Sequence, residues 1–388
     1  MIYFILFWTL INYLCLNVNS FVRVPLQRDH YASLEKSINA KENAGNINGT
    51  VTALKLKYGE RSSGFIGTIS IGTPKNEQVF NMVIDISNTA LWVISSECTT
   101  EICRNHNVYT YEWSKTYESN DRFKSIKDGK DKLLGLGAKD VVQIGSVSVK
   151  SVPFYLVKDL PIDFLLEKTY DGRLGLSLPI NDDDETILET MINQGTLEWN
   201  LFSLYINRTK EPNFTYSGGE LMLGGWNTKY FNPDDIDYIP LSKPGKWQFT
   251  IDRITSAENT TGVWCKSGCE ATVSSTYQFI EGPAKEIKAI YQYIGASIDF
   301  PLLPPNTPIV KCNQINQLPP IKFHINKKEY ILESTDYVVQ TGNPEYCLMA
   351  LIIADNSSDP WKIGYRFLSK YYTIFNASEK KIAFANLK

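Results

Sequence analysis

The sequence predicts an all-β protein built as two related, β-barrel-like lobes. Its 388 residues are enough for two packed domains of ordinary size. From about Gly64 onward, short apolar runs alternate with turn residues, which is typical of β-sandwiches and barrels. One arrangement of strand, polar turn and strand also occurs twice along the chain. This repetition indicates two lobes related by duplication.

The expected strands are short, and turns such as Gly72-Thr73-Pro74 and Gly218-Gly219 separate them. They are expected at Phe65–Ile71, Phe80–Ile86, Leu91–Val93, Asp140–Ile144, Leu201–Ile206, Glu220–Leu223 and Trp247–Ile251. Helical spacing of apolar residues marks Glu185–Gln194 and Pro283–Tyr293. With so few helices, strands must form both lobes.

The repeated arrangement involves two segments about 190 residues apart. In the first, an apolar run ending in Asp85 is followed by a small polar triplet and then Leu91-Trp92-Val93. In the second, Ala271–Val273 is followed by Ser274–Thr276 and then Phe279-Ile280. A glycine-centred strand follows each copy at a distance, at Gly172–Leu176 and at Trp361–Gly364.

The bulk composition is that of an ordinary globular protein. Hydrophobic residues make up 43% of the chain, charged residues 21%, and the net charge is −3. This balance gives no polybasic surface for nucleic acid or for an anionic membrane. We therefore expect no nucleic-acid partner and no stable membrane insertion. We also expect a monomer without a cofactor.

The N-terminus has the pattern of a secretory signal peptide. Residues Met1–Leu16 are almost entirely apolar, and Val18 and Ser20 place small residues before a cleavage site that follows Ser20. The alternative is an uncleaved membrane anchor, but the apolar stretch is short and is interrupted by Thr9 and Asn12.

The cysteines agree with secretion into an oxidising compartment. Of seven cysteines, Cys15 lies in the signal peptide, which leaves six. Several pairings are possible. Two close couples suggest small local loops and leave a third pair to close a long one: Cys98–Cys103, Cys265–Cys269 and Cys312–Cys347. A zinc site is the rival interpretation, but none of the three histidines lies near these cysteines, so no metal is expected.

Asn-x-Ser/Thr sequons add to the case for secretion. They occur at Asn48, Asn207, Asn213, Asn259, Asn356 and Asn376. Together with a signal peptide they indicate a glycosylated protein, either extracellular or in the lumen of the secretory or endolysosomal pathway.

The expected domain organisation follows from these observations. Residues 1–20 form the signal peptide and 21–56 a polar leader or short propeptide. Residues 57–208 form the N-terminal lobe and 209–388 the C-terminal lobe.

Several segments occur in a fixed order between Tyr58 and Lys388. They are Phe65–Pro74, Val83-Ile84-Asp85 with Leu91-Trp92-Val93, Cys98–Asn107, Tyr170–Leu176, Asn193-Gln194-Gly195, Leu201–Tyr205, Gly218–Gly225 and Trp247-Gln248. In this order they resemble the pepsin family of aspartic proteases, over essentially the whole mature chain. The resemblance implies a bilobed fold with a central cleft and the three disulfides given above.

The family's chemistry needs two carboxylates that share one proton. The ionised carboxylate takes a proton from a bound water, which attacks the scissile carbonyl, while the protonated one donates to the substrate. The resemblance implies that each lobe supplies one Asp-Thr/Ser-Gly turn, whose hydroxyl residue supports the paired loops.

Both turns of this sequence depart from that pattern. Asp85 is present in the first, but Ile86 and Ser87 replace the hydroxyl residue and the glycine. In the second, Ser274 stands at the aspartate position and Thr276 at that of the glycine. A serine hydroxyl does not titrate near the working pH, so Ser274 cannot share an acidic proton. Asp85 is then a remnant of the catalytic pair.

The flap that closes over substrate in the family is also altered. Its tyrosine and glycine correspond to Asp128 and Gly129, within the charged stretch Lys127–Lys132. We expect a highly charged hairpin whose lysines are solvated. Asp128 could approach Asp85 from the flap and form an asymmetric carboxylate pair, but a mobile flap would not hold such a pair in place.

Three hypotheses remain from the sequence. The preferred one is a secreted pseudoprotease that binds a peptide or protein in its cleft without hydrolysis. The alternative is an active aspartic endopeptidase with an atypical site built on Asp85. The third is a structural glycoprotein with a collapsed cleft.

Overall fold

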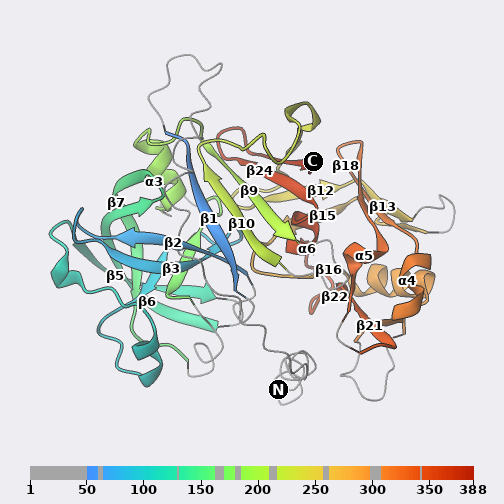
Figure 1. Ribbon diagram of the computed structural model, residues 1–388, viewed down its shortest axis with the longest axis horizontal. Helices are drawn as coiled ribbons and strands as arrows, with labels where there is room; N and C mark the ends of the chain where they lie inside the picture. Colours follow the sequence, from blue (N-terminus) through green and yellow to red (C-terminus); the bar gives the residue numbers. More distant parts are fainter. Residues whose placement is uncertain are drawn as a thin grey trace.

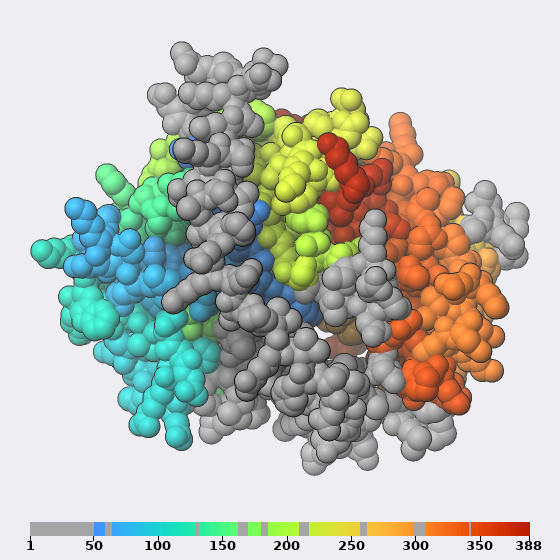
Figure 2. Space-filling view, viewed as in Figure 1, coloured from blue at the N-terminus to red at the C-terminus, as the bar shows by residue number. Residues whose placement is uncertain are grey.

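The computed structural model describes residues 50–59, 64–128, 131–161, 170–179, 185–208, 216–256, 262–297, 307–340 and 343–388. Strands dominate these residues, and they form two lobes joined by a shared central sheet (Figure 1). In Figure 2, the blue and cyan surface of the N-terminal lobe and the orange surface of the C-terminal lobe lie on opposite sides of the molecule. The expected two-lobed, all-β architecture is confirmed.

The central sheet contains strands from the N-terminal and the C-terminal parts of the sequence. It runs in the order β11-β25-β24-β9-β10-β1, and β1 continues the sheet into the N-terminal lobe through β2. Its elements are β1 (Thr52–Gly59), β9 (Leu201–Arg208), β10 (Tyr216–Leu223), η4 (Pro233–Asp235), β11 (Asp237–Pro240), β24 (Tyr371–Asn376) and β25 (Lys381–Asn386).

The strands of this sheet cross two of the expected domain boundaries. β1 begins at Thr52, inside the predicted leader (21–56), and its Leu54 and Leu56 side chains are buried in the core. The end of the predicted leader is thus an integral strand of the fold. β9 and β10 pair with each other across the predicted division at residue 208, so this division cuts a hairpin that both lobes share.

The N-terminal lobe extends the sheet in the order β2-β3-β8-β4-β7-β6-β5. Its elements are β2 (Gly64–Ile71), β3 (Gln78–Asp85), β4 (Trp92–Ile94), η2 (Glu101–Asn105), η3 (Tyr111–Trp113), β5 (Glu118–Asp128), β6 (Asp131–Ile144), β7 (Val147–Val157), β8 (Gly172–Gly175) and α3 (Ile187–Asn193).

The C-terminal lobe contains smaller sheets, in the orders β12-β15-β23-β16-β22, β14-β13-β18-β19 and β17-β21-β20. Its elements are β12 (Gln248–Ile251), β13 (Arg253–Ser256), β14 (Val263–Trp264), β15 (Cys269–Val273), β16 (Ile280–Gly282), α4 (Ala284–Ile294), β17 (Ile309–Lys311), η5 (Cys312–Gln317), β18 (Ile321–Ile325), β19 (Lys328–Leu332), α5 (Ser334–Tyr337), β20 (Val338–Val339), β21 (Tyr346–Met349), β22 (Leu351–Ile353), β23 (Trp361–Ile363) and α6 (Tyr365–Leu368).

The two lobes repeat one local plan, as the sequence predicted. The strand orders β3-β8-β4-β7 and β15-β23-β16-β22 have the same sense of pairing at each step: parallel, antiparallel, parallel. The glycines of β8 and of the turn after β23 allow this close crossing. A Cβ on Gly175 would lie 2.6 Å from the Ala90 carbonyl oxygen, and one on Gly364 only 2.2 Å from that of Phe279.

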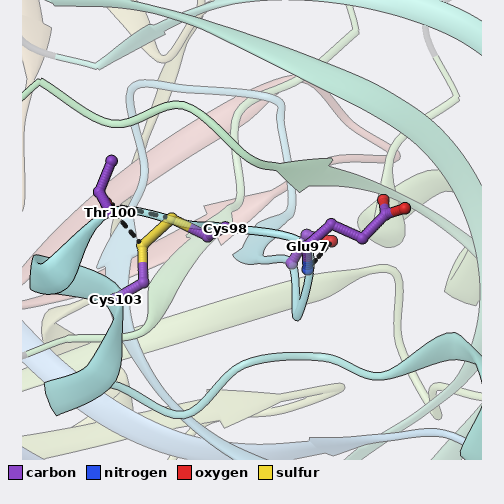
Figure 3. The surroundings of a disulfide bond; sticks show 5 residues. Glu97, Cys98, Thr100 and Cys103 are labelled. Atoms are coloured by element: carbon purple, nitrogen blue, oxygen red, sulfur yellow. Dashed lines mark hydrogen bonds between the residues drawn. A yellow bond between two sulfur atoms is a disulfide. The ribbon is translucent and has the colours of Figure 1, made fainter.

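The three disulfides are those that the sequence suggested. Cys98–Cys103 joins the segment before η2 to η2 itself, with the Thr100 hydroxyl 3.3 Å from each sulfur (Figure 3). Cys265–Cys269 and Cys312–Cys347 lie in the C-terminal lobe. The last pair closes the longest loop, with a sequence separation of 35 residues.

The loop lengths predict unequal contributions to stability. Removing Cys312–Cys347 by a double alanine substitution should lower the free energy of unfolding by about 2 kcal/mol more than removing Cys265–Cys269, because the longer loop restricts the unfolded chain more. Urea denaturation of the two variants measures this difference. An equal loss from both would show that loop closure does not set the effect.

Candidate active site

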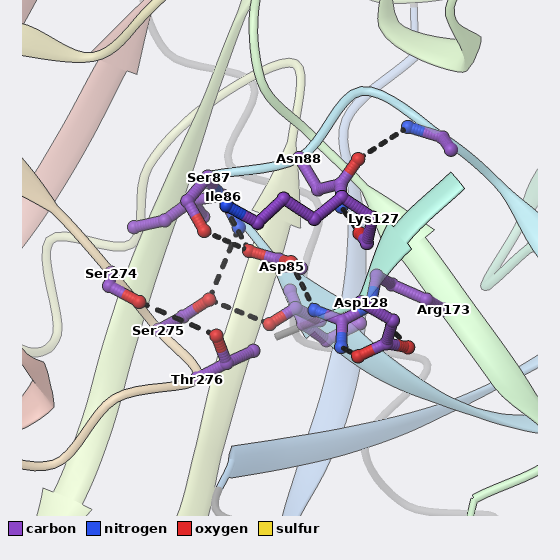
Figure 4. A network of polar contacts seen from close by, with 12 residues as sticks. Asp85, Ile86, Ser87, Asn88, Lys127, Asp128, Arg173, Ser274, Ser275 and Thr276 are labelled. Atoms are coloured by element: carbon purple, nitrogen blue, oxygen red, sulfur yellow. Dashed lines mark hydrogen bonds and ion pairs between the residues drawn. The ribbon is translucent and has the colours of Figure 1, made fainter. Parts of the chain in front are cut away.

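The first half of the site is the end of β3 and the turn that follows it. β3 pairs in parallel with β8, which places Asp85 beside Gly175 and Val83 beside Arg173. The Asp85 side chain is only 2% exposed. Its Oδ1 accepts hydrogen bonds from the Ser87 amide at 2.8 Å and from the Ser87 hydroxyl at 2.5 Å (Figure 4). Ser87 therefore fixes the orientation of this carboxylate.

The second half of the site is the turn after β15. Ser274 follows this strand, and its amide donates to the Ile363 carbonyl of β23 at 2.9 Å. Its hydroxyl lies 3.4 Å from that of Thr276 and is buried. This turn thus offers hydroxyl groups where the two-carboxylate mechanism needs an acid.

Ser275 joins the two turns. Its hydroxyl donates to the Ile84 carbonyl at 2.6 Å and accepts from the Ile86 amide at 3.2 Å (Figure 4). The first lobe cannot return such a bond, because Ile86 has a hydrocarbon side chain. The Ser275 hydroxyl therefore joins the two turns without a matching hydroxyl from position 86.

Arg173 is the residue of the site that sequence reasoning missed. It lies on β8 with 6% of its surface exposed, and its Nη1 forms an ion pair with Asp85 Oδ2. On its other edge, Nη2 pairs with Asp128 Oδ1 and Nε donates to Asp128 Oδ2 at 3.2 Å (Figure 4). Burial alone would lower the pKa of Arg173, but the two carboxylates outweigh it and raise this pKa, so the guanidinium stays charged.

The flap contains the strands β5 and β6, and the end of β5 is held at the site. Asp128 is only 1% exposed, because it pairs with Arg173. The Asn88 carboxamide also donates to the Lys127 carbonyl at 2.7 Å. These contacts bind the end of β5 to β8 and to the turn after β3.

The lysines Lys127 and Lys132 are exposed as expected, whereas Asp128 is buried. The guanidinium of Arg173 binds both Asp85 and Asp128, so a cation bridges the two carboxylates. Gly129 and Lys130 lie outside the described residues.

Asp171, two residues before Arg173 on the chain, anchors neighbouring backbone segments. It accepts bonds from the Asn81 and Asn107 amides at 2.8 and 2.9 Å, and His106 Nδ1 lies 3.4 Å from its Oδ1. Burial would raise the pKa of Asp171, but these donors outweigh it and lower the pKa. Within the described residues, no cluster of three or more His, Cys, Asp or Glu side chains has the arrangement of a metal site.

The asparagines of the sequons differ in how exposed they are. Asn207 and Asn356 are exposed, whereas Asn48, Asn213 and Asn259 lie outside the described residues. Asn376 is buried at the end of β24, where its Oδ1 accepts bonds from the Ser378 hydroxyl and the Glu379 amide. In the folded chain the carboxamide of Asn376 is therefore less accessible than those of Asn207 and Asn356.

The fold and the paired loops identify the class of protein. The chain belongs to the eukaryotic aspartyl protease family, whose sequence model matches residues 64–387. It has the bilobed, all-β, pepsin-like fold of that family.

Individual relatives agree with this assignment. The chain is 32% identical to pepsin A of Bos taurus over 324 residues, 83% of each protein. It is 32% identical to cathepsin E of Aquarana catesbeiana over 329 residues, 83% of this chain and 79% of the relative. It is 33% identical to renin of Canis lupus familiaris over 331 residues, 83% of this chain and 78% of the relative.

The buried charges predict the effect of removing Arg173. Arg173→Met should lower the free energy of unfolding by about 3–5 kcal/mol, because two buried carboxylates lose their counter-ion. Adding Asp85→Asn and Asp128→Asn should recover most of that loss, since no unpaired charge remains. Urea denaturation at neutral pH measures both effects, with Lys132→Gln on the exposed face of the hairpin as a control. A triple variant as unstable as Arg173→Met would contradict this account.

The lowered pKa values of two structural carboxyls predict a loss of stability in acid. Burial would raise the pKa of Asp336, but Arg208 and Lys370 outweigh it and lower this pKa, as the hydrogen bonds do for Asp171. Since both folded-state values lie below the ordinary 3.8, the unfolded chain binds more protons there. The free energy of unfolding should therefore fall as the pH drops through about 3.8.

Urea midpoints measured from about pH 6 to about pH 3 test this fall. Asp336→Asn should make the curve shallower and lower stability at neutral pH. A midpoint that stays constant in wild type across this range would show that these carboxyls do not control acid stability.

Proposed function

We propose that this member of the family binds a peptide or protein between its lobes and does not hydrolyse it. The observation that carries the proposal is the ion pair between Asp85 and Arg173. Both oxygens of Asp85 are engaged, one by Ser87 and the other by a guanidinium that stays charged. A carboxylate held in this way is poorly placed to take a proton from water.

The second turn supports the same conclusion. Ser274 supplies a hydroxyl at the position of the second carboxylate, so the two turns have no acidic proton to share. The junction through Ser275 is nevertheless kept, and it holds the loops of the two lobes together. Retention of the paired loops without the acid favours binding over catalysis.

Family membership favours the alternative, an active aspartic endopeptidase built on Asp85. Asp128 would have to supply its second carboxylate. Arg173 opposes this role, because a charged guanidinium between two carboxylates takes the place of the proton that they would share. A structural glycoprotein without a ligand is the remaining hypothesis, and it predicts that no peptide binds.

We also propose that the protein is a secreted monomer, extracellular or in a secretory or endolysosomal lumen. The three disulfides support an oxidising compartment. Within the described ranges, no helix is both long and apolar enough to cross a bilayer. The exposed sequons at Asn207 and Asn356 are available for glycosylation.

The proposal predicts that the purified protein does not cleave denatured globin at any pH from about 2 to about 6, with or without pepstatin. A positive arm restores the site. It combines Ser274→Asp, Thr276→Gly, Ile86→Thr, Ser87→Gly, Asp128→Tyr and Arg173→Leu. This variant should gain pepstatin-sensitive cleavage, whereas the same variant with Arg173 retained should not, because Asp85 would stay paired.

Turnover by the wild-type protein that Asp85→Asn abolishes would overturn the proposal. It would establish the endopeptidase alternative instead.

A further inference from the structure

The guanidinium of Arg173 presents two distinct edges to its partners. Nη1 faces Asp85, whereas Nε and Nη2 together face the two oxygens of Asp128 (Figure 4). Two parallel N–H donors against two carboxylate oxygens form the fork-to-fork geometry by which arginine recognises carboxylates. Asp128 therefore occupies a site shaped for a carboxylate.

The two carboxylates differ in how they are anchored. Asp85 and Arg173 lie on β3 and β8, which pair with each other in the interior of a sheet. Asp128 lies at the end of β5, where β6 is its only paired neighbour; β6 itself joins β7 only from Gly135 onward. The end of the hairpin is thus a two-stranded ribbon. Besides the ion pair with Arg173, the end of β5 accepts the hydrogen bond from Asn88.

A ligand that enters between the β5–β6 hairpin and the turn after β3 would have to separate Asp128 from Arg173. An uncharged ligand would leave one edge of a buried guanidinium without a partner, which is unfavourable. A ligand carboxylate would replace Asp128 on the same donors, and the number of charges around Arg173 would stay the same. Exchange of one carboxylate for another avoids the cost of breaking the pair.

We propose that Arg173 is the recognition site for a carboxylate of the bound peptide, and that Asp128 occupies this site when no ligand is present. This inference rests on the proposed function of peptide binding. The ligand is an acidic peptide, and either a side-chain carboxylate or a C-terminal carboxylate has the required chemistry. Asp128 acts as an intramolecular competitor that excludes peptides lacking such a group.

The first test asks whether a free carboxylate fills the place of Asp128. In Asp128→Ala, sodium acetate should raise the midpoint of thermal unfolding above the value in sodium chloride at equal ionic strength. Wild type and Lys132→Gln, in which the site is filled, should respond to the two salts alike. Acetamide, a neutral compound of the same shape, should have no such effect.

Equal shifts by acetate and chloride in Asp128→Ala would overturn the proposal. If this variant folds only when acetate is present, the proposal is supported. If it does not fold at all, the peptide experiment on the wild-type protein decides.

The second test uses peptides. Binders selected from a random peptide display library are resynthesised in pairs, with aspartate or glutamate replaced by asparagine or glutamine and with a free or amidated C-terminus. The acidic form should bind wild type on the order of a hundredfold more tightly than its amide counterpart. Comparing the two kinds of pair shows which carboxylate is recognised.

Two variants locate the effect. Asp128→Asn removes the internal competitor and should raise affinity for the acidic peptides about tenfold, a modest part of the preference. Lys132→Gln should leave the affinity for acidic peptides unchanged. A loss of the preference for acidic peptides in this control would assign that preference to the charged surface of the hairpin and overturn the proposal.

The outcomes separate this inference from the proposed function. Binders whose affinity is the same in acidic and amide forms would overturn the role of Arg173 while peptide binding stands. If the library yields no binder, the proposed function fails, and the acetate experiment still reports on the carboxylate site at Arg173.

Discussion

A permanently charged guanidinium buried in the N-terminal lobe constrains the residues around it. Arg173 cannot lose its charge at accessible pH, and its site is almost closed to water, so carboxylates must come to it. Asp85 is near because it ends the neighbouring strand. Asp128 comes from the hairpin, and its approach sets where the hairpin tip lies. One arginine in a short strand thus binds both Asp85 and the end of β5.

The framework around the site does not depend on the carboxylates of the site. Gly175 and Gly364 allow the close crossings of strand and turn in each lobe, and these crossings depend on backbone shape alone. Ser275 joins the lobes through backbone groups of Ile84 and Ile86, with no carboxylate involved. The architecture is therefore secured by contacts that involve no carboxylate of the site. Fold and activity are specified by different residues.

The sequence alone was sufficient for the architecture. Alternation, turn residues and the internal repeat depend on local chemistry, so they predicted the repeated plan, the helices α3 and α4, and part of the strands, among them β2, β3, β4, β9 and β12. Ser274 was found because its neighbours fix its place in the repeat. Arg173 was overlooked, although a charged residue between Gly172 and Leu174 in a short apolar strand was a visible signal of a buried partner. The pairing with Asp128 could not be predicted, because it depends on how a hairpin remote along the chain folds over the sheet. The start of β1 was missed for a similar reason: its partner, β10, follows more than a hundred residues later.

The order of strands in the central sheet has a consequence for how the protein is made. β24 and β25, which are synthesised long after β9, add to the sheet through β9, and the sheet continues through β10 to β1. Contacts so distant along the chain form slowly, because long loops must close before they are made. On the ribosome, the edge of β9 stays open until β24 has emerged from the exit tunnel. During that interval the nascent chain exposes an unpaired strand edge, so protection from aggregation by a chaperone matters most before β24 has been made.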